Sequence, residues 1–204
     1  MRISVISIEK DFVELTETYQ NINWVHAKSL NEIADTDAVD VIINLNKDAY
    51  FEDYSGCKMP VLINSVSNTL KTIKHGAHVI RLNGWSGFLK RTTWELAGEN
   101  NDTLNQLSAL LGIRFSFLPD EPGFVSARVL AMIINEAYFA KEENVSTENE
   151  IDIALKLGTN YPKGPFEWAD EIGLHNVFEL LKTLSLTDAR YTVCKLLEKE
   201  ANKL

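Results

Sequence analysis

The stretch that decides the fold of this 204-residue chain runs from Asp120 to Asp170. It opens with Asp120-Glu121-Pro122-Gly123-Phe124 and closes with Tyr161-Pro162-Lys163-Gly164-Pro165-Phe166-Glu167-Trp168-Ala169-Asp170. Between these two motifs lie Asn135-Glu136-Ala137 and Asp152-Ile153-Ala154-Leu155-Lys156-Leu157-Gly158. The pattern changes at the first motif, because strand-like and helical runs alternate before it and only helical runs follow it. We therefore predict two domains, residues 1–120 and residues 121–204.

The first domain is predicted to be α/β. Runs that are rich in Val and Ile and bounded by polar or turn residues predict strands at 2–7, 22–27, 39–44, 60–65, 78–83 and 113–118. Apolar residues at helical spacing predict helices at 11–20 and 101–111, the second ending at Gly112. Alternation of this kind is typical of a mostly parallel sheet covered by helices.

The second domain is predicted to be all-α. Its first helix, 124–142, is apolar nearly all round, which is typical of a helix buried in a domain or against a partner. Asn135 and Glu136 interrupt this helix and would need hydrogen-bond partners if buried. A capping box at Thr147 to Glu150 predicts the start of the next helix. Further helices are predicted from Pro165, at 174–184 and at 187–202.

Composition narrows the classes of partner. The chain has 45% hydrophobic and 24% charged residues, a net charge of −9 and a pI of about 5.0. No basic stripe and no long apolar run is present, so we expect neither nucleic-acid binding nor a membrane partner. Cys57 and Cys194 lack metal-like spacing, and His75 with His78 do not make a metal site. The N-terminus lacks a signal-peptide cleavage pattern, so we expect a reduced, cytoplasmic protein.

Taken in order and at these spacings, the motifs between Asp120 and Asp170 closely resemble the C-terminal helical domain of the 3-hydroxyacyl-CoA dehydrogenases. That family oxidises the 3-hydroxyl group of a fatty acyl-CoA with NAD. The resemblance covers residues 113–185 well, 60–112 faintly and 1–59 hardly at all. It implies a reduced Rossmann-like sheet domain followed by a helical domain of the dehydrogenase C-terminal type. It also implies that the helical part supplies a homodimer contact and one wall of an acyl-CoA cleft.

The cofactor loop of the family is missing. Its dehydrogenases begin with a strand and a G-x-G-x-x-G turn, which lets the backbone approach the pyrophosphate of the dinucleotide. The corresponding stretch here is Ile8-Glu9-Lys10-Asp11-Phe12-Val13, which has no glycine and two acidic residues. Trp24 to Lys28 supplies no acidic residue to bind the ribose at the end of the second strand. We therefore expect no cofactor and predict that NAD does not bind in the usual mode.

The resemblance also identifies the candidate catalytic residues. The family uses a His as general base and a Glu twelve residues later to orient it. Alignment back from the helical domain places Asn83 at the position of the His, and Glu95 lies twelve residues after Asn83. An amide cannot take up a proton at neutral pH, so the carboxylate is kept and the base is lost. Considered alone, Glu95 could equally be a solvated residue at a strand end.

Two further polar positions of the family are altered. Its P-G-F-x-x-N-R motif has Ala127 in place of the Asn, directly after Ser126. Its N-T-S-S turn is matched by Asn64-Ser65-Val66-Ser67, which leaves Ser65 or Ser67 as a remnant. We take Ser67 and Ser126 as candidate substrate-binding residues.

Three hypotheses follow. The chain is a degenerate family member that still binds an acyl-CoA or related thioester, and we favour this reading. Alternatively, it is an active oxidoreductase on 3-hydroxyacyl-CoA or a related hydroxy acid, with an atypical cofactor mode, Glu95 and an unrecognised base. The third hypothesis is a non-catalytic dimerisation or partner-binding protein that serves another enzyme of fatty-acid metabolism. Whether the chain is an enzyme depends on its site, because fold kinship does not transfer activity.

Overall fold

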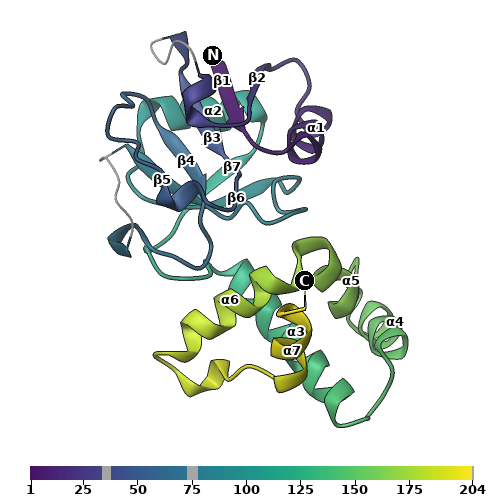
Figure 1. Ribbon diagram of the computed structural model, residues 1–204. Helices are drawn as coiled ribbons and strands as arrows, with labels where there is room; N and C mark the ends of the chain where they lie inside the picture. The colour runs from purple at the N-terminus through teal and green to yellow at the C-terminus, as the bar shows by residue number, and fades with distance from the viewer. Residues whose placement is uncertain (34–37, 73–77, 204) are drawn as a thin grey trace. The chain divides into compact units, whose positions relative to one another are not determined.

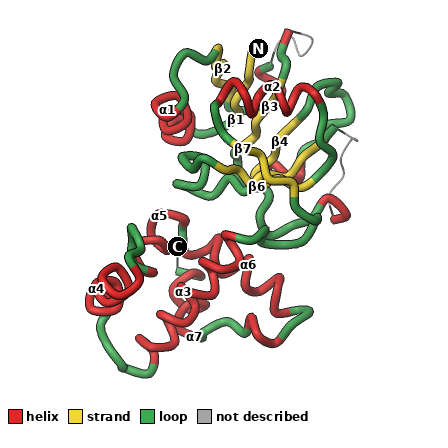
Figure 2. The backbone as a smooth tube through the Cα atoms, turned by 180° about the vertical axis from the view of Figure 1, so that it is seen from behind, coloured by secondary structure: helices red, strands yellow, loops and turns green. Residues whose placement is uncertain are grey.

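The computed structural model describes residues 1–33, 38–72 and 78–203. The chain divides into two compact units, Met1–Phe124 and Val125–Leu204, which we call the sheet unit and the helical unit. The predicted boundary after residue 120 lies a few residues before this division. Figure 1 follows the chain from its N-terminus to its C-terminus, and Figure 2 separates helices from strands by colour.

Among the described residues, seven strands form one sheet in the order β2-β1-β3-β4-β5-β6-β7. Neighbouring strands are parallel except β5 and β6, which are antiparallel. The mostly parallel Rossmann-like sheet is therefore confirmed, and the six predicted strands are present with ends within two residues of those expected. The strands are β1 Arg2–Ile6, β2 Asn23–Ala27, β3 Val41–Asn44, β4 Val61–Asn64, β5 Val79–Leu82, β6 Thr93–Ala97 and β7 Arg114–Phe117.

The described part of the sheet unit has few α-helices: one lies between β1 and β2, and one lies between β6 and β7. Its described α-helices are α1 Glu9–Thr18 and α2 Asp102–Leu111, and the 3-10 turns are η1 Leu30–Glu32, η3 Ala49–Phe51 and η4 Leu70–Thr72. Leu15 of α1 and Leu104, Leu107 and Leu111 of α2 pack in one core with alternate strand residues such as Ile3 and Val5. A second core, around Ile6, Ile42 and Ile63, is covered by loop residues such as Tyr54 and Met59. Two helices thus cover one core, and turns and loops cover the other.

Local signals set both ends of α2, and the predicted stop at Gly112 is confirmed. The Asn101 side chain accepts a hydrogen bond from the backbone N–H of Leu104 over 3.0 Å, which satisfies one of the free amides of the first turn. At the other end, Gly112 has φ of 66° and its N–H bonds back to the last turn. Glycine adopts this left-handed conformation without strain, so the helix stops there.

Strand β6 was not predicted. Its sequence, Thr93-Trp94-Glu95-Leu96-Ala97, is short and carries a charged residue at its centre. Trp94 and Leu96 are buried at 1% and 0% exposure, whereas Glu95 lies on the opposite face of the strand. Pairing with β5 and β7 makes this segment a strand, and such tertiary pairing is not visible in local propensity.

The helical unit contains five α-helices among the described residues: α3 Ser126–Glu142, α4 Glu148–Thr159, α5 Pro165–Ile172, α6 Leu174–Ser185 and α7 Lys195–Ala201. The capping box at the start of α4 is confirmed, because Thr147 and Glu150 satisfy each other's backbone N–H groups. Helix α3 begins two residues later than expected, since Gly123 and Phe124 have positive φ angles of 85° and 47°. It buries one face, while Val129 on another face is 55% exposed.

The helix predicted at 187–202 is wrong in its first half. Ala189–Tyr191 form the 3-10 turn η5, and α7 begins only at Lys195. The reason lies in buried Asn135 of α3, which takes the backbone groups that a continuous helix would use. Its Nδ2 donates to the Thr192 carbonyl and its Oδ1 accepts from the Cys194 N–H, both over 2.9 Å. The expectation that a buried Asn135 needs partners is confirmed, and Glu136 is exposed.

Helices α4 and α5 are joined through Asp152, the only buried residue among those of α4. Its carboxylate accepts from the Phe166 N–H over 2.9 Å and from the Glu167 N–H over 3.2 Å. These are free amides of the first turn of α5, where a negative charge is also favoured by the helix dipole. Gly164 lies against this carboxylate, so that a Cβ atom at residue 164 would overlap it.

No helix among the described residues is both long and apolar enough to cross a membrane.

Candidate functional site

The structure brings Asn83 and Glu95 together. Asn83 directly follows β5, and Glu95 lies in the neighbouring strand β6. The Asn83 N–H donates to the Glu95 carbonyl over 3.0 Å, and the side-chain Nδ2 of Asn83 donates to Oε2 of Glu95 over 2.9 Å. Asn83 is 2% exposed and Glu95 is half-buried. A carboxylate and an amide therefore form a pre-arranged pair at the carboxyl end of β5.

Asn64, at the end of β4, holds the chain next to this pair. Its Oδ1 accepts from the Gly84 N–H over 3.2 Å. A Cβ atom on residue 84 would lie 3.0 Å from Cγ of Asn64, closer than ordinary contact allows. The carboxyl end of β4 is thus linked to the chain after β5 by a side chain that packs closely against a glycine.

The other candidate residues lie in different places. Ser65 is buried, and its hydroxyl donates to the Asn68 carbonyl over 3.2 Å. Ser67 is half-buried in the same turn after β4. Ser126 is the first residue of α3 in the helical unit, and Ala127 beside it is 0% exposed. The assignment of Ser67 and Ser126 to substrate binding stays a prediction.

Sequence reasoning missed the most connected side chain near these residues. Arg81 lies on β5 two residues before Asn83, is 0% exposed and forms an ion pair with Asp120. A single arginine within Val79-Ile80-Arg81-Leu82 was the available signal, because a charge in a buried strand must be paired. The sequence does not reveal its partner, which lies 39 residues away.

The carboxyl end of β1, where the family binds its dinucleotide, is occupied by side chains of the chain itself. His26 of β2 lies with Nδ1 3.3 Å from a Glu9 carboxylate oxygen and Nε2 2.9 Å from the Ser7 carbonyl. The His26 ring also stacks on Phe12, with ring centroids 4.3 Å apart. Asn46, which follows β3, donates from Nδ2 to the Lys28 carbonyl over 3.1 Å. Because β1 lies between β2 and β3, the Asn46–Lys28 bond joins the segments on either side of β1.

The charge near the start of α1 and the small hollow along the helix also oppose a dinucleotide. Burial, and secondly the charge of Glu14, raise the pKa of Asp11. An anion already present there is thus unfavourable before any pyrophosphate is added. The hollow between α1 and residues 84–90 measures about 20 Å³, room for roughly one water molecule. The residues present do not fit NAD in the mode that a G-x-G-x-x-G turn provides.

Metal binding finds no support in the described part of the chain. It contains no group of three or more His, Cys, Asp or Glu side chains that could hold a metal ion. Nε2 of His78 lies 2.9 Å from the Tyr54 carbonyl, and His75 lies outside the described residues. Both cysteines are free and buried.

Comparison with known proteins identifies the second half of the chain. Residues 123–203 match the family model described as 3-hydroxyacyl-CoA dehydrogenase, C-terminal domain. These residues are therefore similar to the C-terminal domain of that family. The resemblance stated from the motifs is therefore confirmed.

Relatives of known name support the same assignment. The 3-hydroxyadipyl-CoA dehydrogenase of Escherichia coli strain K12 is 41% identical over 86 residues, which is 41% of this chain and 18% of that protein. A probable 3-hydroxybutyryl-CoA dehydrogenase of Bacillus subtilis strain 168 is 45% identical over 82 residues, 39% of this chain and 29% of that protein. The matches thus span less than a third of either relative.

Solved structures are also similar to the sheet unit, and at their low sequence identity this similarity concerns the fold alone. The (S)-3-hydroxybutyryl-CoA dehydrogenase of Ralstonia eutropha has a TM-score of 0.66 at 24% identity, over 89% of this chain and 70% of its own. FadB2 of Mycobacterium tuberculosis has a TM-score of 0.75 at 14% identity, over 99% of this chain and 93% of its own. The helical unit thus resembles the C-terminal domain of the 3-hydroxyacyl-CoA dehydrogenases, and the whole chain shares its fold with the two solved structures.

Proposed function

We propose that this chain is a catalytically degenerate 3-hydroxyacyl-CoA dehydrogenase-like protein that binds a CoA thioester without oxidising it. The observation that carries the proposal is the Asn83–Glu95 pair. The Glu95 carboxylate accepts a hydrogen bond from an amide, over 2.9 Å, at the position where the family resemblance implies a histidine base. Because a carboxamide has no basic nitrogen, nothing at residue 83 can accept the proton of a substrate hydroxyl.

The cofactor end of the sheet supports the same conclusion independently. Hydride transfer needs an acceptor, and the acceptor of this family is NAD. His26 contacts both Glu9 and Phe12 beside the carboxyl end of β1. Asp11 adds a half-buried carboxylate in the first turn of α1, where burial and the charge of Glu14 raise its pKa. Loss of the base and loss of the cofactor loop are separate changes, and either alone would abolish the family reaction.

The ligand class comes from the named relatives. They are dehydrogenases of 3-hydroxyadipyl-CoA and 3-hydroxybutyryl-CoA, and their identity of 41% and 45% to this chain lies in its helical half. The backbone beside the pair is held in place, because the Gly84 N–H donates to Asn64 and the Asn83 N–H donates to the Glu95 carbonyl. A short-chain acyl-CoA or a related thioester is therefore the ligand to test first.

Two measurements test the proposal. Isothermal calorimetry with 3-hydroxybutyryl-CoA, acetoacetyl-CoA and free CoA should give saturable heat for at least the thioesters. A steady-state assay with 3-hydroxybutyryl-CoA and NAD should give no NADH above a protein-free blank. Turnover that Glu95→Gln abolishes would establish the active-oxidoreductase alternative instead. The absence of heat with all three CoA compounds would leave the partner-binding alternative.

We further propose that the chain is a homodimer through the helical unit. Helices α3 and α4, with η5, line an apolar hollow of about 820 Å³ that includes Val129, Met132, Ile133 and Leu155. Helix α4 buries none of its apolar side chains within the chain, and its Leu157 is 83% exposed. An apolar surface of this kind on one helix face is typical of a protein–protein contact.

A second copy of the chain is the occupant that this hollow fits. Its lining carries charges of both signs: Arg128 and Arg190 are positive, and Glu136 is negative. A twofold contact places the same surface on both subunits, so opposite charges can meet their counterparts across the axis.

Light scattering coupled to gel filtration tests the dimer. Wild type should have twice the chain mass of 23.0 kDa. Val129→Lys places a charge on the 55% exposed wall of the hollow and should give a monomer with unchanged helix content. Val145→Lys, at a 70% exposed position that does not line the hollow, is the matched control and should remain dimeric. A monomeric wild type, or a Val129→Lys variant that is still dimeric, would overturn this assignment.

A further inference from the structure

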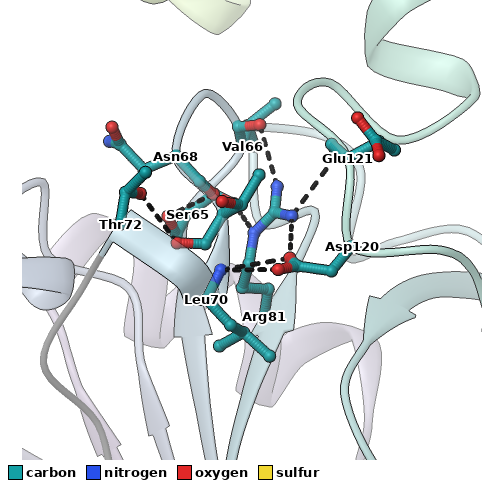
Figure 3. A network of polar contacts seen from close by, with 9 residues as sticks. Ser65, Val66, Asn68, Leu70, Thr72, Arg81, Asp120 and Glu121 are labelled. Atoms are coloured by element: carbon teal, nitrogen blue, oxygen red, sulfur yellow. Dashed lines mark hydrogen bonds and ion pairs between the residues drawn. The ribbon is translucent and has the colours of Figure 1, made fainter.

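The guanidinium group of Arg81 joins three segments of the sheet unit (Figure 3). Nη1 donates to Oδ1 of Asp120 over 2.6 Å and to the Glu121 carbonyl over 3.3 Å. Nε donates to the Ser65 carbonyl over 2.9 Å, and Nη2 donates to the Val66 carbonyl over 3.1 Å. Strand β5, the turn after β4 and the segment after β7 therefore share one side chain. Arginine suits this role because its N–H donors lie in one rigid plane and point in several directions, whereas lysine has a single ammonium group on a flexible chain.

Asp120 connects the same segments from the other side. Its Oδ2 and Oδ1 accept from the Leu70 N–H over 2.9 and 3.1 Å, while Oδ1 also binds Arg81. A direct backbone bond runs alongside, from the Gly123 N–H to the Val66 carbonyl over 2.8 Å. The segments 65–70 and 120–124 are thus linked at both of their ends.

The turn that ends the second segment depends on the same guanidinium. Gly123 and Phe124 have φ angles of 85° and 47°, and a left-handed backbone is disfavoured for a residue with a side chain as large as that of Phe124. The Phe124 ring is 5% exposed and its centroid lies 4.7 Å from Cζ of Arg81. Such a conformation persists only where surrounding contacts determine it, and stacking on a buried cation is one of these contacts.

We propose that Arg81 and Asp120 form a clamp that fixes segments 65–70 and 120–124 in one arrangement, so that both segments loosen together when the clamp is broken. The strands keep their own ladder hydrogen bonds, so they stay paired when the segments open. Segment 65–70 contains Ser67, which makes Arg81 a positioning residue for the candidate thioester site. Only this last part rests on the proposed function.

Amide hydrogen exchange, followed by NMR on the full chain, tests the clamp. Asp120→Asn keeps the shape of the side chain but removes the charge opposite buried Arg81, and Arg81→Met removes the guanidinium but keeps an apolar stem. In both variants the Leu70 and Gly123 amides should exchange at least about tenfold faster than in wild type, while amides of β1 and β3 change by less than about twofold. Lys90→Met, which removes an exposed lysine paired with Glu14 in the same unit, is the matched control and should change neither.

The outcomes separate the clamp from ordinary destabilisation. Faster exchange at Leu70 without Gly123, or at neither, would overturn the proposal, and so would a parallel loss of protection in β1 and β3. If Arg81→Met does not fold, the same readouts in Asp120→Asn decide. Calorimetry with acetoacetyl-CoA tests the positioning role, which requires weaker binding by Asp120→Asn than by Lys90→Met. A wild type that binds no thioester would defeat the proposed function, but the exchange data would still decide the clamp.

Discussion

Two hydrogen bonds join Asn83 to Glu95, one between their backbones over 3.0 Å and one between their side chains over 2.9 Å. The backbone bond belongs to the pairing of β5 with β6, so the sheet itself sets the separation of the two side chains. Within this frame the identity of residue 83 decides the chemistry. A ring nitrogen at the end of the bond could act as a base, whereas the amide of Asn83 stabilises the carboxylate and does nothing further.

Replacing Asn83 by Asp should destabilise the chain at neutral pH. The substitution puts a second carboxylate against Glu95, at a position that is 2% exposed. We expect the free energy of unfolding to fall by about 1–3 kcal/mol. The two acids would share a proton, so their apparent pKa would rise, and the penalty would be present above that pKa and lost as the pH falls below it. Urea unfolding at pH 7 and at acidic pH measures this. Adding Glu95→Gln should restore stability at pH 7, and equal stability of Asn83→Asp and wild type there would contradict the prediction.

Local signals in the sequence were sufficient for most of the fold. The helix ends at Asn101, Gly112 and Thr147 followed their capping chemistry, because those interactions lie within a few residues of chain. Strand β6 and the break before α7 were not predictable in this way. Each depends on a distant partner, β5 and β7 in one case and Asn135 in the other.

In the candidate site, too, features that depend on residues distant in sequence were not predicted. The spacing of Asn83 and Glu95 was available from the family resemblance, and the structure places the two side chains in contact. Arg81 was visible as a charge in an apolar strand, but its partner Asp120 was not, because nothing local links residues 39 positions apart. The contacts of His26 with Glu9 and Phe12 were missed for the same reason.

Gly164→Ala should disrupt the junction of α4 and α5. The added methyl group would overlap the Asp152 carboxylate, which caps α5 through the Phe166 and Glu167 amides. We expect a loss of about 2–4 kcal/mol in the free energy of unfolding, since either the cap or the backbone must move. Gly158→Ala is the control, because no atom lies within 4 Å of its added Cβ. That variant should be neutral or up to about 1 kcal/mol more stable, in line with helix propensity, and both are measured by thermal unfolding followed by circular dichroism.

Asn135→Leu should destabilise the helical unit despite adding apolar volume. The change leaves the Thr192 carbonyl and the buried Cys194 N–H without the partners that Asn135 supplies. Each unsatisfied group destabilises the fold by about 1–3 kcal/mol. Burial of one leucine side chain in a site shaped for an amide stabilises it by less than this loss. Asn149→Ala, at an exposed position of α4, should change stability by less than about 0.5 kcal/mol. A Leu variant as stable as wild type in urea would show that the break before α7 does not need these two bonds.

Removing the charge of Asp11 tests whether the start of α1 favours an anion. Burial first, and the charge of Glu14 second, raise the pKa of Asp11 above its ordinary value of 3.8. A carboxyl group with a raised pKa in the folded state disfavours folding when ionised, so its penalty is present above that pKa and is absent below pH 3.8. Asp11→Asn should therefore gain stability relative to wild type as the pH rises from about 3 to 7, by roughly a few tenths of a kcal/mol after solvent screening. Glu17→Gln, at an exposed position near the other end of α1, controls for the loss of one charge. If the helix dipole dominated, as it does where a helix N-terminus binds phosphate, the difference between Asp11→Asn and wild type would change with pH in the opposite direction.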